Sequence, residues 1–142
     1  VGDRAAVSDK LREAWEQAEA LTRDNTRITL AVAFNYGGRW DMVQAARQAI
    51  AEGVAPEQLD EAWLSRHMAL SFAPDPDLFI RTGGEMRISN FMLWQSAYAE
   101  FYFTDCLWPD FGAEEIDRAL AAYAQRDRRF GMIRPPAVQA AE

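Results

Sequence analysis

The sequence predicts an α/β fold in which a mostly parallel sheet is flanked by helices. Strand-like segments alternate along the chain with segments whose apolar residues recur at helical spacing. The first strand-like segment, residues 28–34, is almost continuously apolar, as strands of parallel sheets are when both faces are covered. Turns rich in glycine follow this segment and the next one, residues 78–81. The chain is expected to form a single domain, residues 1–142, with a loose tail at residues 135–142.

The first expected helix begins after Ser8, whose side chain can cap its N-terminus. An apolar stripe at helical spacing then predicts one buried face, formed by Leu11, Trp15, Ala18 and Leu21. The strand at residues 28–34 follows this helix. It ends at the turn sequence Asn-Tyr-Gly-Gly of residues 35–38.

Two more helices are expected before the second strand. Asp41 can cap the first of these helices, and Gly53 can end it. Pro56 suits the first turn of the next helix, whose inward residues are expected to be Leu59, Trp63 and Leu64. The second strand, residues 78–81, then runs into the glycine turn of residues 82–84.

The last third of the chain is expected to add two helices and a strand. Residues 89–99 are expected to form a helix capped by Ser89 or Asn90, and residues 100–105 form a third strand. The final helix is expected over residues 113–130, where acidic residues at the start and basic residues at the end match the helix dipole. The basic residues at its end, and the glycine that follows, are Arg126, Arg128, Arg129 and Gly131.

Composition excludes several kinds of protein. A net charge of −7 disfavours nucleic acid as a partner. Cys106 and His67 are the only cysteine and histidine, which excludes an internal disulfide, a thiolate cluster and a multi-histidine metal site. Lys10 is the only lysine and lacks a Walker-type loop, so bound anions would be held by arginine. No run is long and apolar enough for a membrane span, and no signal peptide opens the chain, so a cytoplasmic setting is expected.

The run from Arg81 to Asn90 is the best candidate for a binding site. Ligands of parallel sheets bind beyond the carboxyl ends of the strands, where Arg81 is expected to lie. Two glycines leave backbone amides open, and Arg87, Ser89 and a helix N-terminus follow at once. These groups would suit a phosphate or diphosphate. The alternative is an ordinary glycine turn with two solvated arginines, and the residues alone favour neither interpretation.

Two weaker signals accompany this run. The amides of residues 35–41 and the guanidinium of Arg39 could border the same pocket, although a tight turn before a capped helix is the favoured interpretation. Glu100 lies among aromatic residues, so its carboxylate should be paired or should bind a cation such as Mg²⁺. An ion pair of Glu100 with Arg81 or Arg87 is the favoured alternative. Met86 and Cys106 are expected to be packing residues.

Three stretches together resemble the bacterial cis-prenyltransferases, whose best-matching members make undecaprenyl diphosphate. They are FNYGGRWD, DLFIRTGGEMRISNFMLWQSAYAEFYFTDCLWPDF and RRFG, and the resemblance extends from Gly2 to Gly131. It implies the cis-prenyltransferase fold and an Mg²⁺-dependent enzyme. This enzyme would extend farnesyl diphosphate with isopentenyl diphosphate units to make a lipid carrier for cell-wall sugars. It also implies a cytoplasmic homodimer that contacts the membrane for product release.

The resemblance assigns roles to individual positions of this chain. Glu100 resembles a magnesium ligand. The residues that would hold isopentenyl diphosphate are Arg81, Arg87, Ile88 and Ser89. Two further residues resemble the element that reaches the substrate site of the partner subunit, and they are Arg129 and Gly131.

Two departures from the family pattern limit what this chain is expected to do. The first-strand loop Asp-Gly-Asn-Gly-Arg-Trp-Ala, with the essential aspartate, is absent, so these residues resemble a C-terminal portion without catalytic residues of its own. The residues that set product length are expected upstream as well. Met86 stands where some relatives carry histidine, which leaves Glu100 as the only expected protein metal ligand. The alternatives are a non-catalytic subunit of such an enzyme and a generic anion-binding module.

Overall fold

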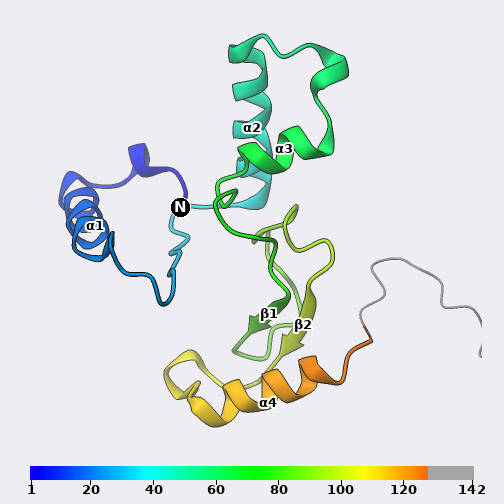
Figure 1. Ribbon diagram of the computed structural model, residues 1–142. Helices are drawn as coiled ribbons and strands as arrows, with labels where there is room; N and C mark the ends of the chain where they lie inside the picture. The colour runs from blue at the N-terminus through cyan, green and yellow to red at the C-terminus, as the bar shows by residue number, and fades with distance from the viewer. Residues whose placement is uncertain (128–142) are drawn as a thin grey trace, which may run out of the picture. The chain divides into compact units, whose positions relative to one another are not determined.

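The computed structural model describes residues 1–127, in two compact units (Figure 1). The first unit comprises Val1–Asp75 and Ile88–Gln95, and the second comprises Pro76–Arg87 and the chain from Ser96 onward. The helices are α1 (Asp9–Thr22), α2 (Gly38–Glu52), α3 (Glu61–His67) and α4 (Ala113–Ala124), and the strands are β1 (Leu78–Arg81) and β2 (Glu100–Phe103). Short 3₁₀ turns occur at Arg4–Ala6, Pro56–Gln58 and Trp108–Asp110.

The strands β1 and β2 pair in parallel, which confirms the α/β class with a parallel sheet. The register places Leu78 opposite Glu100 and Arg81 opposite Phe103. Phe79 and Phe101 face each other across the pair, with ring centroids 5.1 Å apart. Helix α4 lies beside β2 in the same unit. The carboxyl edge of this pair is therefore where Arg81 ends its strand.

Helix α1 forms where the sequence predicts it. The Ser8 hydroxyl accepts a hydrogen bond from the backbone N–H of Leu11, as expected of an N-cap. The expected buried stripe does not form, because no residue of α1 is buried. Trp15 makes an edge-on contact with Phe34, with ring centroids 5.4 Å apart.

The expected strand at residues 28–34 is wrong for the part of the chain that the structure describes. These residues are irregular, and Ile28 and Leu30 are more than four-fifths exposed. Within residues 1–127 the segment bonds to the start of the chain, where the Val1 amino group donates to the Val32 carbonyl at 2.7 Å. The Phe34 N–H donates in return to the Val1 carbonyl at 3.0 Å. A strand requires hydrogen bonds to a neighbouring strand along its length. Within residues 1–127, nothing longer than these first residues pairs with the segment.

Helix α2 begins at Gly38 and its N-cap is Gly37, four residues earlier than the expected cap Asp41. Asp41 lies inside the first turn of the helix and is only 2% exposed. Gly53 ends the helix in a left-handed conformation (φ 66°), as expected. Asp41 was a plausible cap by residue type, but its carboxylate serves a buried network that is described below.

The segment after Pro56 divides into a 3₁₀ turn and helix α3. Asp60 caps α3 by accepting a hydrogen bond from the Trp63 N–H at 2.7 Å. Trp63 is buried as expected, whereas Leu59 is 41% exposed and does not point inward. His67 has a structural role, because its ring stacks on Trp63 with centroids 3.6 Å apart and its Nδ1 lies 2.7 Å from the Trp63 carbonyl.

The helix expected over residues 89–99 does not form in the described structure, which has turns there. Ser89, Asn90 and Met92 have φ angles of 47°, 63° and 48°, which belong to the left-handed region and break a right-handed helix. Asn90 is indeed a helix cap, but it caps α2. The expected cap at the start of a helix over residues 89–99 is therefore wrong.

Helix α4 ends at Ala124, earlier than the expected end at residue 130. Arg126 follows the helix, whereas residues 128–131 and the tail at 135–142 lie outside the described residues. Met86 is 80% exposed, so it is not a packing residue. The expectation of a single domain stays a prediction. Among residues 1–127, no helix has the length and apolar character needed to cross a bilayer.

Candidate functional site

The carboxyl edge of β1 and β2 is closed by a glycine turn. The Thr104 N–H donates to the Arg81 carbonyl at 3.0 Å and so extends the ladder beyond β2. Gly83 and Gly84 then turn back, with φ angles of 85° and 75°. Their N–H groups donate to the carbonyls of Cys106 (2.9 Å) and Thr104 (3.0 Å). The turn is thus held at both glycines by the segment that follows β2, so the expectation that their amides are open to an anion is wrong.

Gly84 is required for two reasons. Its left-handed φ disfavours any side chain. A Cβ atom there would also lie 2.9 Å from Oδ1 of Asp105. The φ angle is the stronger of the two reasons, because the Asp105 carboxylate lies at the end of a side chain and can shift.

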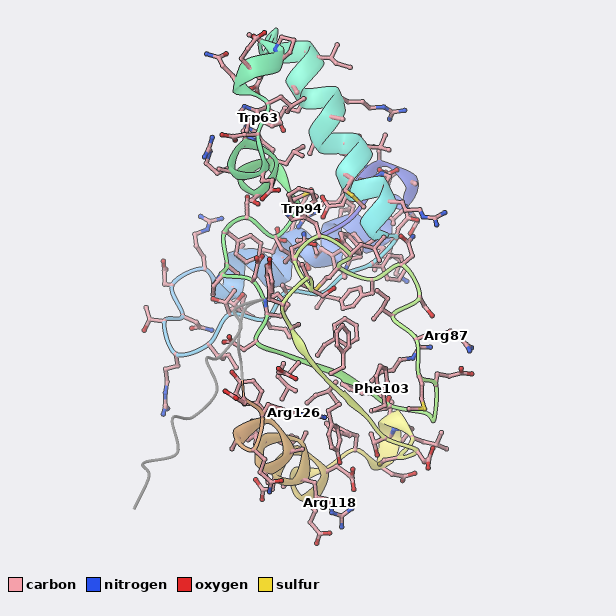
Figure 2. All side chains as sticks on the ribbon, turned by 90° about the vertical axis from the view of Figure 1, so that its right-hand side faces the viewer. Trp63, Arg87, Trp94, Phe103, Arg118 and Arg126 are labelled. Carbon is pink, nitrogen blue, oxygen red and sulfur yellow. The ribbon has the colours of Figure 1, made fainter. Side chains whose placement is uncertain are left out.

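Arg81 and Arg87 belong to the same unit and are joined directly. The Arg81 guanidinium donates from Nη1 to the Arg87 carbonyl, which ties the strand end to the far end of the loop. The Arg87 side chain is 65% exposed and extends away from the ribbon in Figure 2. It forms an ion pair with Glu85. Exposed pairs of this kind contribute little to stability, so a phosphate could displace Glu85 at small cost.

Ile88 and Ser89 belong to the first unit, whereas Arg81 and Arg87 belong to the second. The Ile88 carbonyl accepts a hydrogen bond from the Phe91 N–H at 3.0 Å. This bond closes a turn that holds Ser89 in its left-handed conformation. The convergence of these four residues on one ligand stays a prediction.

Asn90 caps helix α2 from a distant part of the sequence. Its carbonyl accepts a hydrogen bond from the Gly38 N–H at 2.6 Å, and its Oδ1 accepts one from the Arg39 N–H at 3.0 Å. A Cβ atom at Gly37 would lie 2.6 Å from Nδ2 of Asn90, so a side chain there would displace the Asn90 amide. The turn of residues 35–38 is thus joined to the segment that carries Ser89. The sequence marked both segments as candidates, and only the structure shows that they meet.

Asp41 is the centre of a buried network in the first unit. Its Oδ2 accepts hydrogen bonds from the Tyr36 hydroxyl (2.9 Å) and from Nε2 of Gln95 (3.0 Å). Its Oδ1 accepts one from the Ala69 N–H (2.8 Å). Burial, together with the hydrogen bond to Asp41, raises the pKa of the Tyr36 phenol well above its usual value. The network joins α2, the segment after α3 and the segment before Ser96.

An open pocket of about 280 Å³ lies in the first unit beside the end of α3. Trp94 lines it and donates from Nε1 to the Ser65 hydroxyl at 2.9 Å. Gln95 also lines it, and its Oε1 is buried without a protein partner. None of the residues that the sequence predicts for diphosphate binding lines this pocket.

Glu100 lies at the amino end of β2, because the register places it opposite Leu78. It is therefore at the other end of the strand pair from Arg81. Its carboxylate is 28% exposed and lies 3.9 Å from Nε of Arg126. The partner of Glu100 is thus Arg126, where the sequence suggested Arg81 or Arg87.

Glu100 is the carboxylate that the sequence assigns to a metal ion. The described residues contain no group of three or more His, Cys, Asp or Glu side chains arranged for one. Mg²⁺ is often held by one or two carboxylates, with phosphate oxygens and waters as its other ligands. Glu100 fits Mg²⁺ only on those terms. Arg129 and Gly131, which were expected to serve the partner subunit, lie outside the described residues.

Comparison with known families gives one long match. The Prenyltransf family, described as "Putative undecaprenyl diphosphate synthase", matches residues 1–131. This match includes both candidate segments and all of α1 to α4.

Individual proteins are similar over nearly the whole chain. An isoprenyl transferase of Neisseria meningitidis serogroup B is 55% identical over 131 residues, which are 92% of this chain and 52% of that protein. The ditrans,polycis-undecaprenyl-diphosphate synthase ((2E,6E)-farnesyl-diphosphate specific) of Escherichia coli K12 is 51% identical over 140 residues, 95% of this chain and 55% of that protein. The chain spans about half the length of these curated relatives.

A solved structure shares the fold. The lavandulyl diphosphate synthase of Lavandula x intermedia, in complex with dimethylallyl diphosphate, aligns with a TM-score of 0.87 and 40% sequence identity. The alignment covers 93% of this chain and 58% of that one.

Proposed function

Because the chain belongs to the undecaprenyl diphosphate synthase family of prenyltransferases, we propose that the protein condenses isopentenyl diphosphate with an allylic diphosphate. The allylic substrate would be farnesyl diphosphate, and the product would be undecaprenyl diphosphate or a similar cis-polyprenyl diphosphate. The names of the two bacterial relatives support this substrate class.

The reaction requires an anchored diphosphate. The C–O bond of the allylic diphosphate breaks, and its carbon bonds to the double bond of isopentenyl diphosphate. A proton then leaves, and free diphosphate is released with a chain that is one unit longer. Rate depends on holding the double bond against the developing cation, which a fixed diphosphate group achieves. The charge that develops on the leaving group is stabilised by cationic groups nearby.

One observation carries the proposal for this chain. Arg81 ends β1 at the carboxyl edge, and the glycine turn and Arg87 follow it directly. Two guanidinium groups on such a turn are suited to a diphosphate, because each can form two parallel hydrogen bonds to its oxygens. We assign the diphosphate of isopentenyl diphosphate to Arg81 and Arg87, with Ile88 and Ser89 as further contacts.

Magnesium and the subunit partner belong to the same proposal. Glu100 would hold Mg²⁺, although its carboxylate lies at the opposite end of the strand pair from Arg81. When Mg²⁺ is bound, it would neutralise part of the negative charge of the diphosphate. We further propose a homodimer in which Arg129 and Gly131 serve the partner's site. The setting would be cytoplasmic, with membrane contact for product release.

A non-catalytic subunit of a prenyltransferase complex is the alternative. Such a subunit has no need of diphosphate ligands. Retention of Arg81, Arg87, Ser89 and Glu100 in this chain favours the enzyme.

Steady-state kinetics of an Arg87→Ala variant of the full-length protein test the proposal. We expect the KM for isopentenyl diphosphate to rise by about tenfold or more, since a charge-assisted hydrogen bond contributes roughly 1.5–3 kcal/mol. The KM for farnesyl diphosphate should stay close to that of the unsubstituted protein. Arg47→Ala, which removes an exposed arginine of α2, is the matched control. Equal KM values for isopentenyl diphosphate in both variants would show that Arg87 does not belong to the site. The absence of any polyprenyl product from the unsubstituted protein would contradict the proposed function.

A further inference from the structure

Thr104 lies immediately after β2 and joins three parts of the second unit. Its backbone N–H donates to the Arg81 carbonyl, and its carbonyl accepts from the Gly84 N–H, both at 3.0 Å. Its hydroxyl donates to Oε2 of Glu115 at 3.1 Å. Glu115 lies in the first turn of α4. One residue thus bonds the end of β1, the glycine turn and a helix.

The hydroxyl of Thr104 also accepts a hydrogen bond. The Cys106 N–H donates to it at 3.2 Å, and the Cys106 carbonyl accepts from the Gly83 N–H at 2.9 Å. Serine and threonine hydroxyls can donate and accept at the same time, whereas valine has the same shape and does neither. The hydroxyl therefore fixes the segment that supports both glycines of the turn.

Glu115 is itself held in place. Its side chain is 13% exposed and forms an ion pair with Arg118, one helical turn further on. The neighbouring Glu114 contrasts with it, since Glu114 is 91% exposed and lies 3.6 Å from the same arginine. Figure 2 shows Arg118 on α4. Only one of these two glutamates reaches the carboxyl edge of the strands.

We propose that Thr104 and Glu115 are positioning residues that fix the glycine turn, and through it Arg81 and Arg87, for the diphosphate of isopentenyl diphosphate. This role rests on the proposed function, because it serves the same anchor. The turn has no helix to stiffen it, since residues 89–99 form turns. The hydrogen bond from Thr104 to Glu115 of α4 supplies rigidity in its place. A displaced anchor lowers affinity and misplaces the reacting double bond.

The test combines amide exchange and kinetics in the full-length protein, with the variants Thr104→Val, Thr104→Ser and Glu114→Gln. In Thr104→Val we expect faster hydrogen exchange at the Gly83 and Gly84 amides, measured by NMR. We also expect the KM for isopentenyl diphosphate to rise by about threefold to tenfold, the effect of one lost hydrogen bond. The KM for farnesyl diphosphate should not change. In Thr104→Ser, the exchange rate of the two amides and the KM for isopentenyl diphosphate should stay close to those of the unsubstituted protein. Glu114→Gln should alter neither quantity.

The outcomes separate this inference from the proposed function. Unchanged exchange at both glycines in Thr104→Val overturns the positioning role. Faster exchange with an unchanged KM for isopentenyl diphosphate overturns it as well, because the turn is then not coupled to the anchor. If the unsubstituted protein does not bind isopentenyl diphosphate, the proposed function fails, and the failure is recognised before any variant is compared. Thermal unfolding of each variant confirms that the comparison is between folded proteins.

Discussion

Asp41 illustrates how a charged side chain is accommodated at a buried position. A carboxylate removed from water is costly unless hydrogen bonds replace its hydration. Three donors do so here, from Tyr36, Ala69 and Gln95. The donors lie in three different segments, so the carboxylate connects parts of the first unit that are distant in sequence. Loss of one donor is expected to affect the stability of the whole network.

The variant Tyr36→Phe removes one donor and keeps the ring. We expect it to lower the free energy of unfolding at pH 7 by about 1–2 kcal/mol, because the buried carboxylate loses a hydrogen bond. Urea unfolding monitored by circular dichroism measures this change. The matched control is Tyr102→Phe, since Tyr102 lies on β2 in the second unit and outside this network. Equal stability of the two variants would contradict the role of the hydroxyl.

The same hydroxyl predicts a pH dependence. The pKa of Tyr36 is higher in the folded protein than in an unfolded chain, where it is about 10. The folded state therefore retains the proton at pH values where the unfolded state loses it, and stability falls as the pH rises above about 10. The difference between the unsubstituted protein and Tyr36→Phe should be constant from pH 6 to 9 and should shrink above about 10. A constant difference up to pH 11 would contradict this assignment.

Among the elements, α2 depends on a cap from outside its own segment. The first N–H groups of a helix have no partner within the helix. Asn90 satisfies two of them, with its carbonyl and its side chain. Its left-handed φ of 63° suits asparagine, which adopts this conformation more readily than other residues with side chains. Position 90 therefore needs both the side-chain oxygen and the backbone tolerance of asparagine.

Substitution of Asn90 tests this cap. Asn90→Ala removes the side-chain acceptor, and we expect it to lower the free energy of unfolding by about 1–2 kcal/mol. Asn90→Asp keeps an acceptor oxygen beside the positive end of the helix dipole and should lose less than about 0.5 kcal/mol. Asn25→Ala, an exposed position in a turn, is the control. Chemical denaturation measures all three, and an alanine variant as stable as the aspartate variant would exclude the cap.

Local signals predicted those elements whose determinants lie close together in the sequence. The Ser8 cap, the Gly53 terminus and both parallel strands were predicted on this basis and are present. Residues 89–99 have the residue types of a helix, but the backbone of Asn90 is turned toward α2 and interrupts it. No local pattern shows that a cap serves a helix 51 residues earlier.

In the candidate site, too, features set by neighbouring residues were predicted and features set by distant residues were not. Arg81, Arg87 and the glycines were identified from the spacing of residue types after a strand. The role of Thr104 was missed, because a threonine after a strand is common and its partner Glu115 lies 11 residues further on. The pairing of Glu100 with Arg126 was missed as well, since it depends on how α4 lies beside β2.

At the scale of the whole molecule, residues 28–34 form an apolar surface. Ile28, Leu30, Val32 and Phe34 are each at least 48% exposed, and they alternate along the segment as residues on one face of a strand do. Such patches on soluble proteins mark surfaces that another element or molecule covers. The 142-residue chain on its own is therefore expected to expose this surface to solvent.

Dye binding by the 142-residue chain measures the surface. The variant with both Ile28→Thr and Leu30→Thr should lower the fluorescence of the hydrophobic dye ANS by roughly half, since two of the four apolar side chains become polar. Ile50→Thr is the control, because Ile50 is 82% exposed but lies on α2. An equal decrease in both variants would mean that the dye does not recognise the segment. Sedimentation velocity should show less self-association in the double variant.

The long-range cap has a consequence for biosynthesis. Arg39 leaves the ribosome 51 residues before Asn90. At roughly 5–20 residues per second, about 3–10 seconds pass between the synthesis of Arg39 and that of Asn90, whose side-chain oxygen caps helix α2. The chain also enters the second unit at Pro76 and returns to the first at Ile88 before either is finished. The two units therefore cannot fold one after the other in the order of translation. A nascent chain that ends before Asn90 would leave α2 without this cap.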